Sequence, residues 1–238
     1  MPLVYPTVFL GRGKVGDGSP APALLLHFDG SNGSSTFTDS SKFERTVTRS
    51  SSGVFISTGQ SVFGGASVLF DIIVSYLEVI GTNSDLALGA GDFTVDFWMR
   101  PDSVSSINTN ILSYFRPSDF TAKLAILQQN NKVVVFSGAT ELIVQSNTLS
   151  AATWAHVALV RSSGTVTLYI NGVSRGSASD STTFVSAVDR PRIGKTGSND
   201  TGLTGQFGGY LDELRIVIGT AVWTADFTPP AAPYAPFG

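Results

Sequence analysis

Short runs of alternating or β-branched apolar residues, each bounded by turn residues, fill most of the sequence. FTVDFWM at residues 93–99 and TVTLYI at residues 165–170 are clear examples. Three dipeptides between such runs fit two-residue hairpin turns, whose central residues adopt positive φ: Asn130-Asn131, Ser163-Gly164 and Asn171-Gly172. Because no helical period separates the runs, the pattern predicts antiparallel sheets packed as an all-β sandwich.

Alternation along two of these runs separates core residues from outward-facing ones. The core-facing set comprises Phe93, Val95, Phe97, Met99, Val166, Leu168 and Ile170. Asp96, Trp98 and Tyr169 point the other way, so we expect them on an outer surface as candidate ligand-binding residues. The alternative is that a loop covers Trp98, because Trp side chains are mostly buried in folded proteins.

Composition excludes several classes of protein. A formal net charge of −3 gives no basic field for nucleic acid, which is therefore not an expected partner. The absence of Cys excludes disulfides and thiolate metal sites and favours synthesis in a reducing cytoplasm. No apolar run approaches the roughly 20 residues of a membrane helix, so no membrane insertion is expected. Arg12 and Lys14 follow the N-terminal apolar run instead of preceding it, which does not fit an export signal.

Residues 1–22 differ in character from residues 23–238, which we interpret as the sandwich domain. The apolar piece LVYPTVFL is followed by GRGKVGDGSPAPA, whose glycines and prolines form a linker. Both faces of the apolar piece are hydrophobic, so we expect this N-terminal arm to contact another polypeptide. The predicted interface residues are Leu3, Val4, Tyr5, Val8, Phe9 and Leu10.

Four segments occur in an order that resembles a known family. They are LLLHFDG, FTVDFWMRPDS, TWAHVALVRSSGTVTLYINGV and GYLDELRIVIGTAVWTADFTPP, within residues 24–230. The order is similar to that of laminin G-like domains of the concanavalin A-like lectin/glucanase superfamily. The closing phrase is most similar to versions in tail-fibre and other virion proteins of bacteriophages. The resemblance implies a jelly-roll sandwich of two antiparallel sheets.

The resemblance also implies a metal hypothesis for Asp29 and Asp212. In many relatives the equivalent acidic residues, near the first and last core strands, lie together and sometimes hold a structural calcium ion. Calcium is the one candidate cofactor, and the sequence alone establishes none. Calcium takes six to eight oxygen ligands. The alternative is that Asp212 and Glu213 form surface salt bridges with Arg215, Arg192 or Lys195. Strand alternation places Glu213 on the face opposite to Asp212, turned to solvent together with Arg215.

The final segment predicts a structural latch. Trp223 and Phe227 are apolar side chains that would tie the chain end to the sandwich. Pro229 and Pro230 stop further strand pairing.

A second apolar cluster stands where relatives usually have a polar turn. This chain has FDIIVSYL, so that Ile72, Ile73 and Val74 replace small polar residues. An exposed apolar cluster predicts a protein contact site. The alternative is a longer strand with Ile72 and Val74 on one face.

Catalysis is not expected. Retaining glycosidases need two carboxylates about 5 to 5.5 Å apart, whereas FTVDFWM carries only Asp96, with Asp92 just before it. His27 and His156 each stand alone in an expected strand, where a structural role is more common than a base.

The sequence thus favours a non-enzymatic phage protein on the virion surface: a capsid decoration, head fibre or tail appendage. Its expected partners are other virion proteins through the arm, host surface glycans, and further copies of the chain. The alternative is a free-standing carbohydrate-binding lectin, with Trp98, Tyr169 or the loop residues Tyr114 and Phe115 stacking on sugar rings. For Tyr114 and Phe115, a further core strand is the competing interpretation. A glycoside hydrolase is the third function considered.

Overall fold

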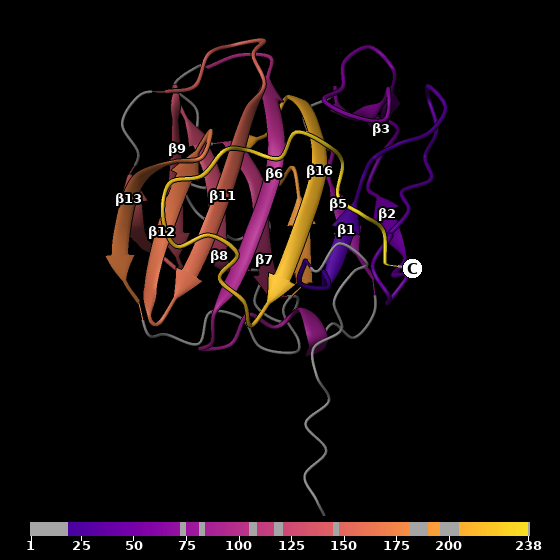
Figure 1. Ribbon diagram of the computed structural model, residues 1–238. Coiled ribbons are helices and arrows are strands. Elements are labelled where there is room, and N and C mark those ends of the chain that lie inside the picture. Colours follow the sequence, from indigo (N-terminus) through magenta and orange to yellow (C-terminus); the bar gives the residue numbers. More distant parts are fainter. Residues whose placement is uncertain are drawn as a thin grey trace, which may run out of the picture.

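The computed structural model describes residues 19–71, 75–80, 84–104, 109–116, 121–144, 148–180, 190–195 and 205–237. These residues form two sheets that pack face to face (Figure 1). The only helical turn among them is η1, a 3-10 turn at Ser84–Leu86, and they contain no helix that could cross a membrane. The predicted all-β sandwich is confirmed.

Each sheet has eight strands. The first runs in the order β13 (Val173–Ser179), β12 (Thr165–Ile170), β11 (Ala155–Ser162), β6 (Phe93–Pro101), β16 (Gly209–Ile218), β4 (Ser67–Phe70) and β3 (Val54–Ser57), with β1 (Leu24–Leu26) also paired to β16. The second runs in the order β10 (Thr140–Val144), β9 (Lys132–Ser137), β8 (Thr121–Gln129), β7 (Thr109–Arg116), β14 (Arg190–Ile193), β5 (Leu77–Val79) and β2 (Val47–Arg49), with β15 (Gly205–Gln206) parallel to β7. Non-consecutive neighbours such as β6 and β16 give the jelly-roll character.

The three predicted hairpin turns are all present. The pairs that close them are Gln129 with Lys132, Ser162 with Thr165, and Ile170 with Val173. Both central residues have positive φ in the last two turns: 49° and 79° at Ser163 and Gly164, and 52° and 76° at Asn171 and Gly172. Local turn chemistry therefore fixes these registers.

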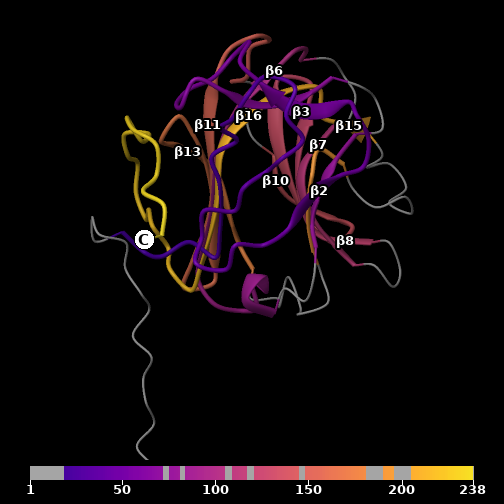
Figure 2. The same cartoon turned by 90° about the vertical axis from the view of Figure 1, so that its right-hand side faces the viewer.

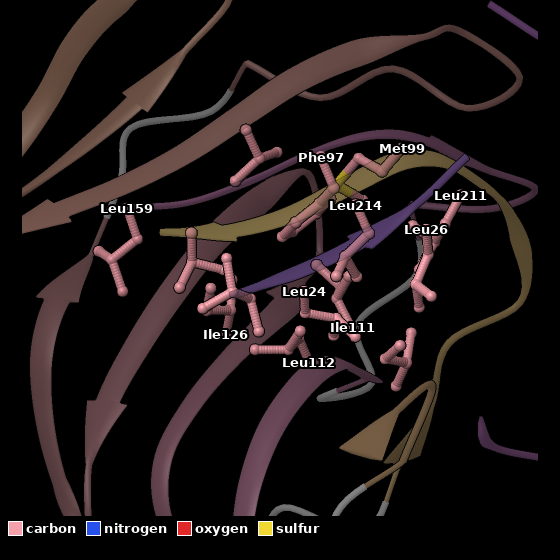
Figure 3. Packing of buried hydrophobic residues seen from close by; sticks show 14 of the residues in the cluster. Leu24, Leu26, Phe97, Met99, Ile111, Leu112, Ile126, Leu159, Leu211 and Leu214 are labelled. Atoms are coloured by element: carbon pink, nitrogen blue, oxygen red, sulfur yellow. The ribbon is translucent and has the colours of Figure 1, made fainter. Parts of the chain in front are cut away.

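The core lies between the two sheets, and Figure 3 shows its close packing. All of the predicted inward-facing residues of β6 and β12 are fully buried there. Leu24 and Leu26 of β1 join them. Tyr114 is fully buried in β7, so the core-strand interpretation is right for this residue and the exposed-loop interpretation is wrong. The side chain of Phe115 lies outside the described residues.

Residues 219–237, the C-terminal strap, cover the outer face of the first sheet. Figure 1 shows the strap crossing β12, β11, β6 and β16, and Figure 2 shows it on the side away from the second sheet. The amide of Val222 donates to Oγ1 of Thr94 at 2.9 Å, and the amide of Phe227 donates to the carbonyl of Gly172 at 2.8 Å. The predicted latch is confirmed, and this outer face is covered instead of open.

Strand β16 changes its edge partner halfway along. Gly209–Leu211 pair with β4, whereas Leu214–Ile216 pair with β1. A β-bulge separates the two stretches, and Glu213 within it has a φ of 51°. The bulge places one extra residue opposite β6 and shifts the face alternation that follows. Asp212 and Glu213 therefore lie at the gap between β4 and β1.

Because of the strap, the same Gly→Ala substitution should lower the free energy of unfolding by different amounts in two matched hairpin turns. At Gly164 an added Cβ meets no atom within 4 Å, so Gly164→Ala should cost only the left-handed backbone penalty, about 1–2 kcal/mol. At Gly172 the Cβ would overlap the carbonyl oxygen of Phe227 in the strap. We expect Gly172→Ala to lower the free energy of unfolding by more than about 3 kcal/mol, as measured by urea denaturation. Equal costs at the two turns would mean that the strap does not rest on the second one.

Candidate functional site

Two of the three predicted ligand-binding residues are buried beneath the strap. Asp96 is fully buried and Tyr169 is 3% exposed, while Trp98 is half-buried. The ring of Tyr169 packs against Phe227 at a centroid distance of 5.4 Å, and Phe227 stacks on Trp223 at 4.0 Å. The ring of Tyr169 is therefore covered by the protein itself.

Trp98 lies in a row of cross-strand partners, between Asp212 of β16 and His156 of β11. Its ring contacts His156 at a centroid distance of 5.2 Å and Phe63 at 6.3 Å, both edge-on. The loop that carries Phe63 thus covers part of Trp98. This agrees with the interpretation that a loop covers this side chain.

Asp96 is the centre of a buried polar cluster. Nε of Arg215 donates to its Oδ1 at 2.9 Å, and Nε2 of His156 lies 3.4 Å from its Oδ2. The hydroxyl of Tyr234, from the strap, also donates to Oδ2. Burial opposes ionisation, but Arg215, His156 and Tyr234 outweigh it and lower the pKa of Asp96. The carboxylate is therefore ionised, and both of its oxygens have hydrogen-bond partners within the protein.

Arg215 and Glu213 do not face solvent, so that prediction is wrong. They are 4% and 1% exposed. The guanidinium of Arg215 lies over the ring of Tyr234 at 3.7 Å and that of Trp223 at 5.4 Å. The bulge in β16 turns Glu213 towards the same outer face as Asp212, and the strap covers that face, so both Glu213 and Arg215 are buried.

Glu213 ties the first strand to the strap. Its Oε1 lies 2.7 Å from Nδ1 of His27, and its Oε2 accepts a hydrogen bond from the amide of Tyr234 at 3.0 Å. Burial opposes the charging of His27, but the bond and charge of Glu213 outweigh it and raise the pKa of His27. Both histidines thus serve structural contacts.

Asp212 anchors the loop before β4. Its Oδ2 accepts hydrogen bonds from the amides of Val62 at 2.7 Å and Phe63 at 3.2 Å. Burial, aided by the charges of Glu213 and Asp29, raises the pKa of Asp212 to about 7. Asp29 is exposed and lies against Gly64 of the same loop. The two carboxylates therefore flank one loop and lie within electrostatic range of each other.

The donor set fits calcium only in part. Oδ1 of Asp212 is buried and has no hydrogen-bond partner among the described residues. In the part of the chain that the structure describes, no group of three or more His, Cys, Asp or Glu side chains could hold a metal ion. The ordinary salt-bridge alternative does not hold for Arg215, which pairs with Asp96. Calcium between Asp29 and Asp212 stays a prediction.

The predicted interface residues cannot be placed. The arm residues Leu3, Val4, Tyr5, Val8, Phe9 and Leu10, and the cluster Ile72, Ile73 and Val74, lie outside the described residues. Sequence reasoning missed Tyr234, Glu213 and His27 as members of the polar layer. An acidic pair inside an apolar strand was the available signal, since two adjacent acids can share a face only at a bulge.

Two antiparallel eight-stranded sheets in jelly-roll order define a concanavalin A-like sandwich. Residues 76–220, more than half of the 238, match the family model of the concanavalin A-like lectin/glucanases superfamily. The chain belongs to that superfamily. No curated protein matches the sequence significantly.

Solved structures share the fold at low sequence identity. Domain 4 of AbnA, an extracellular arabinanase from Geobacillus stearothermophilus solved with arabinotriose, has a TM-score of 0.62 at 17% identity, over 84% of this chain and 94% of that one. Botulinum neurotoxin type C depends on interaction with two ganglioside molecules for cell entry. Its structure has a TM-score of 0.63 at 16% identity, over 85% of this chain and 49% of the toxin chain. The binding domain of Paraclostridial Mosquitocidal Protein 1 has a TM-score of 0.59 at 19% identity, over 85% and 50%. This chain spans about half the length of the two toxin chains.

The raised pKa of Asp212 predicts that the free energy of unfolding depends on pH when a chelator keeps metal ions away. The pKa of Asp212 in the folded state, about 7, lies above its ordinary value of 3.8. The stabilisation of the folded state by the protonated carboxyl group is therefore fully present below pH 3.8 and is lost as the pH rises through 7. We expect the free energy of unfolding to fall between pH 4 and 8, by up to about 4 kcal/mol. Asp212→Asn should flatten this dependence, whereas Glu44→Gln, at an exposed carboxylate, should not.

The same proteins test the calcium prediction. An ion between Asp29 and Asp212 binds only the folded state, so calcium should raise the Tm of the unsubstituted protein and not that of Asp212→Asn. Identical Tm values with calcium and with chelator would contradict the metal hypothesis.

Proposed function

We propose that the protein is a non-catalytic, lectin-like surface domain of a bacteriophage virion, as a capsid decoration, head fibre or tail appendage. The N-terminal arm attaches it to other virion proteins, and the sandwich adheres to host surface glycans. It reaches the virion surface after synthesis in the host cytoplasm.

One observation carries the non-catalytic part of the proposal. Asp96, the single acidic residue of β6, is fully buried and bonded to Arg215 and Tyr234. Its lowered pKa suits neither a general acid nor an accessible nucleophile. Asp92, the other candidate carboxylate, accepts a hydrogen bond from the amide of Ser163 at 2.8 Å. Both carboxylates thus have structural partners.

Fold and sequence support the remaining parts. The superfamily includes lectins, and of two proteins with a similar fold one was solved in complex with arabinotriose and the other depends on gangliosides for cell entry. The closing phrase GTAVWTADFTPP resembles phage versions of the fold. The apolar segment of residues 3–10, tethered by glycines, suits attachment to a protein surface.

Truncation separates attachment from folding. A protein that lacks residues 1–20 should melt as a folded domain, because the described sheets begin at Leu24, yet it should no longer co-sediment with particles that lack this chain. The full chain is the positive control. If the truncated protein still binds the particles, the arm is not the attachment element.

A glycan array tests the adhesive part, and its outcomes separate the alternatives. We expect glycan binding without turnover, unchanged in Asp96→Asn when it is assayed below its lowered Tm. Glycan binding without any particle association would favour the free-standing lectin. Turnover of a polysaccharide that Asp96→Asn abolishes would identify a glycoside hydrolase.

A further inference from the structure

A groove of about 160 Å³ opens where the described chain begins. Residues 20–23 form one wall, and Val217 and Ile218 at the end of β16 form another. Phe43, which is 38% exposed, completes an apolar lining, with Lys42 and Asp85 as its charged members. Its lining residues include none of the members of the polar cluster around Asp96.

Polar contacts hold the walls of this groove in place. The guanidinium of Arg45 lies over the ring of Phe43 at 4.1 Å. The same group bonds to Asp85 and to the carbonyl of Ala23. The amide of Ala23 donates to the carbonyl of Ile216 at 2.7 Å. The groove is therefore preformed, which lowers the entropy lost when a ligand binds.

The chain itself contains an apolar segment of suitable chemistry. Residues 3–10 are apolar on both faces and precede the groove by a tether, residues 11–19, with glycine at 11, 13, 16 and 18. Fully extended, this tether reaches about 30 Å.

The root of the tether favours a neighbour's groove over its own. Pro20 and Pro22 hold Ser19 and Ala21 in extended conformations, because a residue before proline is restricted to that region. The root of the tether therefore runs along one side of the groove in an extended conformation. An arm that entered its own groove would have to reverse completely within residues 11–18. An arm that entered a neighbour's groove needs no reversal, and exchange of identical segments between copies is a common route to oligomers.

We infer that this groove binds the apolar arm, residues 3–10, of a second copy of the chain. The inference rests on the proposed attachment role of the arm and adds a second copy of this protein to the virion proteins that receive it. Leu3, Val4, Tyr5, Val8, Phe9 and Leu10 supply the apolar side chains, and Phe43 and Ile218 receive them. The partner is thus a homo-oligomer formed by arm exchange.

The absence of Cys allows a clean cross-linking test. One chain carries Val8→Cys, Phe9→Cys or Leu10→Cys in the arm, and a second chain carries Thr220→Cys, whose position lines the groove. After mixing and mild oxidation, at least one arm variant should form a disulfide-linked heterodimer with Thr220→Cys. Val173→Cys, exposed on the far edge strand β13, is the matched control and should give at least tenfold less product.

Three results would overturn the inference. They are no heterodimer with any arm position, equal yields with Val173→Cys, or an intramolecular disulfide in a dilute chain that carries both cysteines. The last result would place the arm in its own groove.

Oligomeric state gives a second readout that does not depend on disulfide geometry. Analytical ultracentrifugation should show oligomers for the unsubstituted chain and monomers for Phe43→Glu, which puts a charge into the groove. Ile80→Glu, at an equally exposed apolar residue that does not line the groove, should leave the oligomers intact. Monomers in all three proteins would refute arm exchange. If those monomers still join particles through the arm, the proposed function stands without this inference.

Discussion

The outer face of the first sheet depends on the buried ion pair between Asp96 and Arg215. Removing two charges from water costs several kcal/mol for each ion, so the pair persists only where further groups satisfy both partners. Tyr234 and His156 do this for Asp96, and aromatic rings from the strap cover Arg215. The strap is therefore an integral third layer, because it supplies a hydrogen bond to Asp96 and the rings that cover Arg215.

The same layer explains why adjacent acids stand inside an apolar strand. Between its pairing with β4 and with β1, strand β16 has no edge partner at the bulge. Carboxylates fill that gap by accepting hydrogen bonds, Asp212 from the 62–63 loop and Glu213 from the strap. A residue pattern that suggests a metal site thus serves to join three separate segments to one strand: the 62–63 loop, the strap and the chain at His27.

Local signals in the sequence predicted much of the fold and little of the polar cluster. Gly164 and Gly172 fixed their turns, and the alternation around Phe97 identified the core face, because both depend on neighbouring residues only. Arg215 was assigned to the wrong face since a bulge reverses the alternation, and the bulge results from a change of partner strand far along the chain. The contact between Tyr234 and Asp96 joins residues 138 positions apart, and no local pattern predicts it.

Native-state hydrogen exchange tests most directly whether the strap closes this face permanently. The amides of Val222, Phe227 and Tyr234 each donate a hydrogen bond to the sandwich or to its bulge. If the strap is an integral layer, these amides should exchange only through global unfolding, at the same free energy as the amide of Val95 in the core strand β6. Exchange at least 100-fold faster than at Val95 would show that the strap opens on its own and exposes Asp96, contrary to this account.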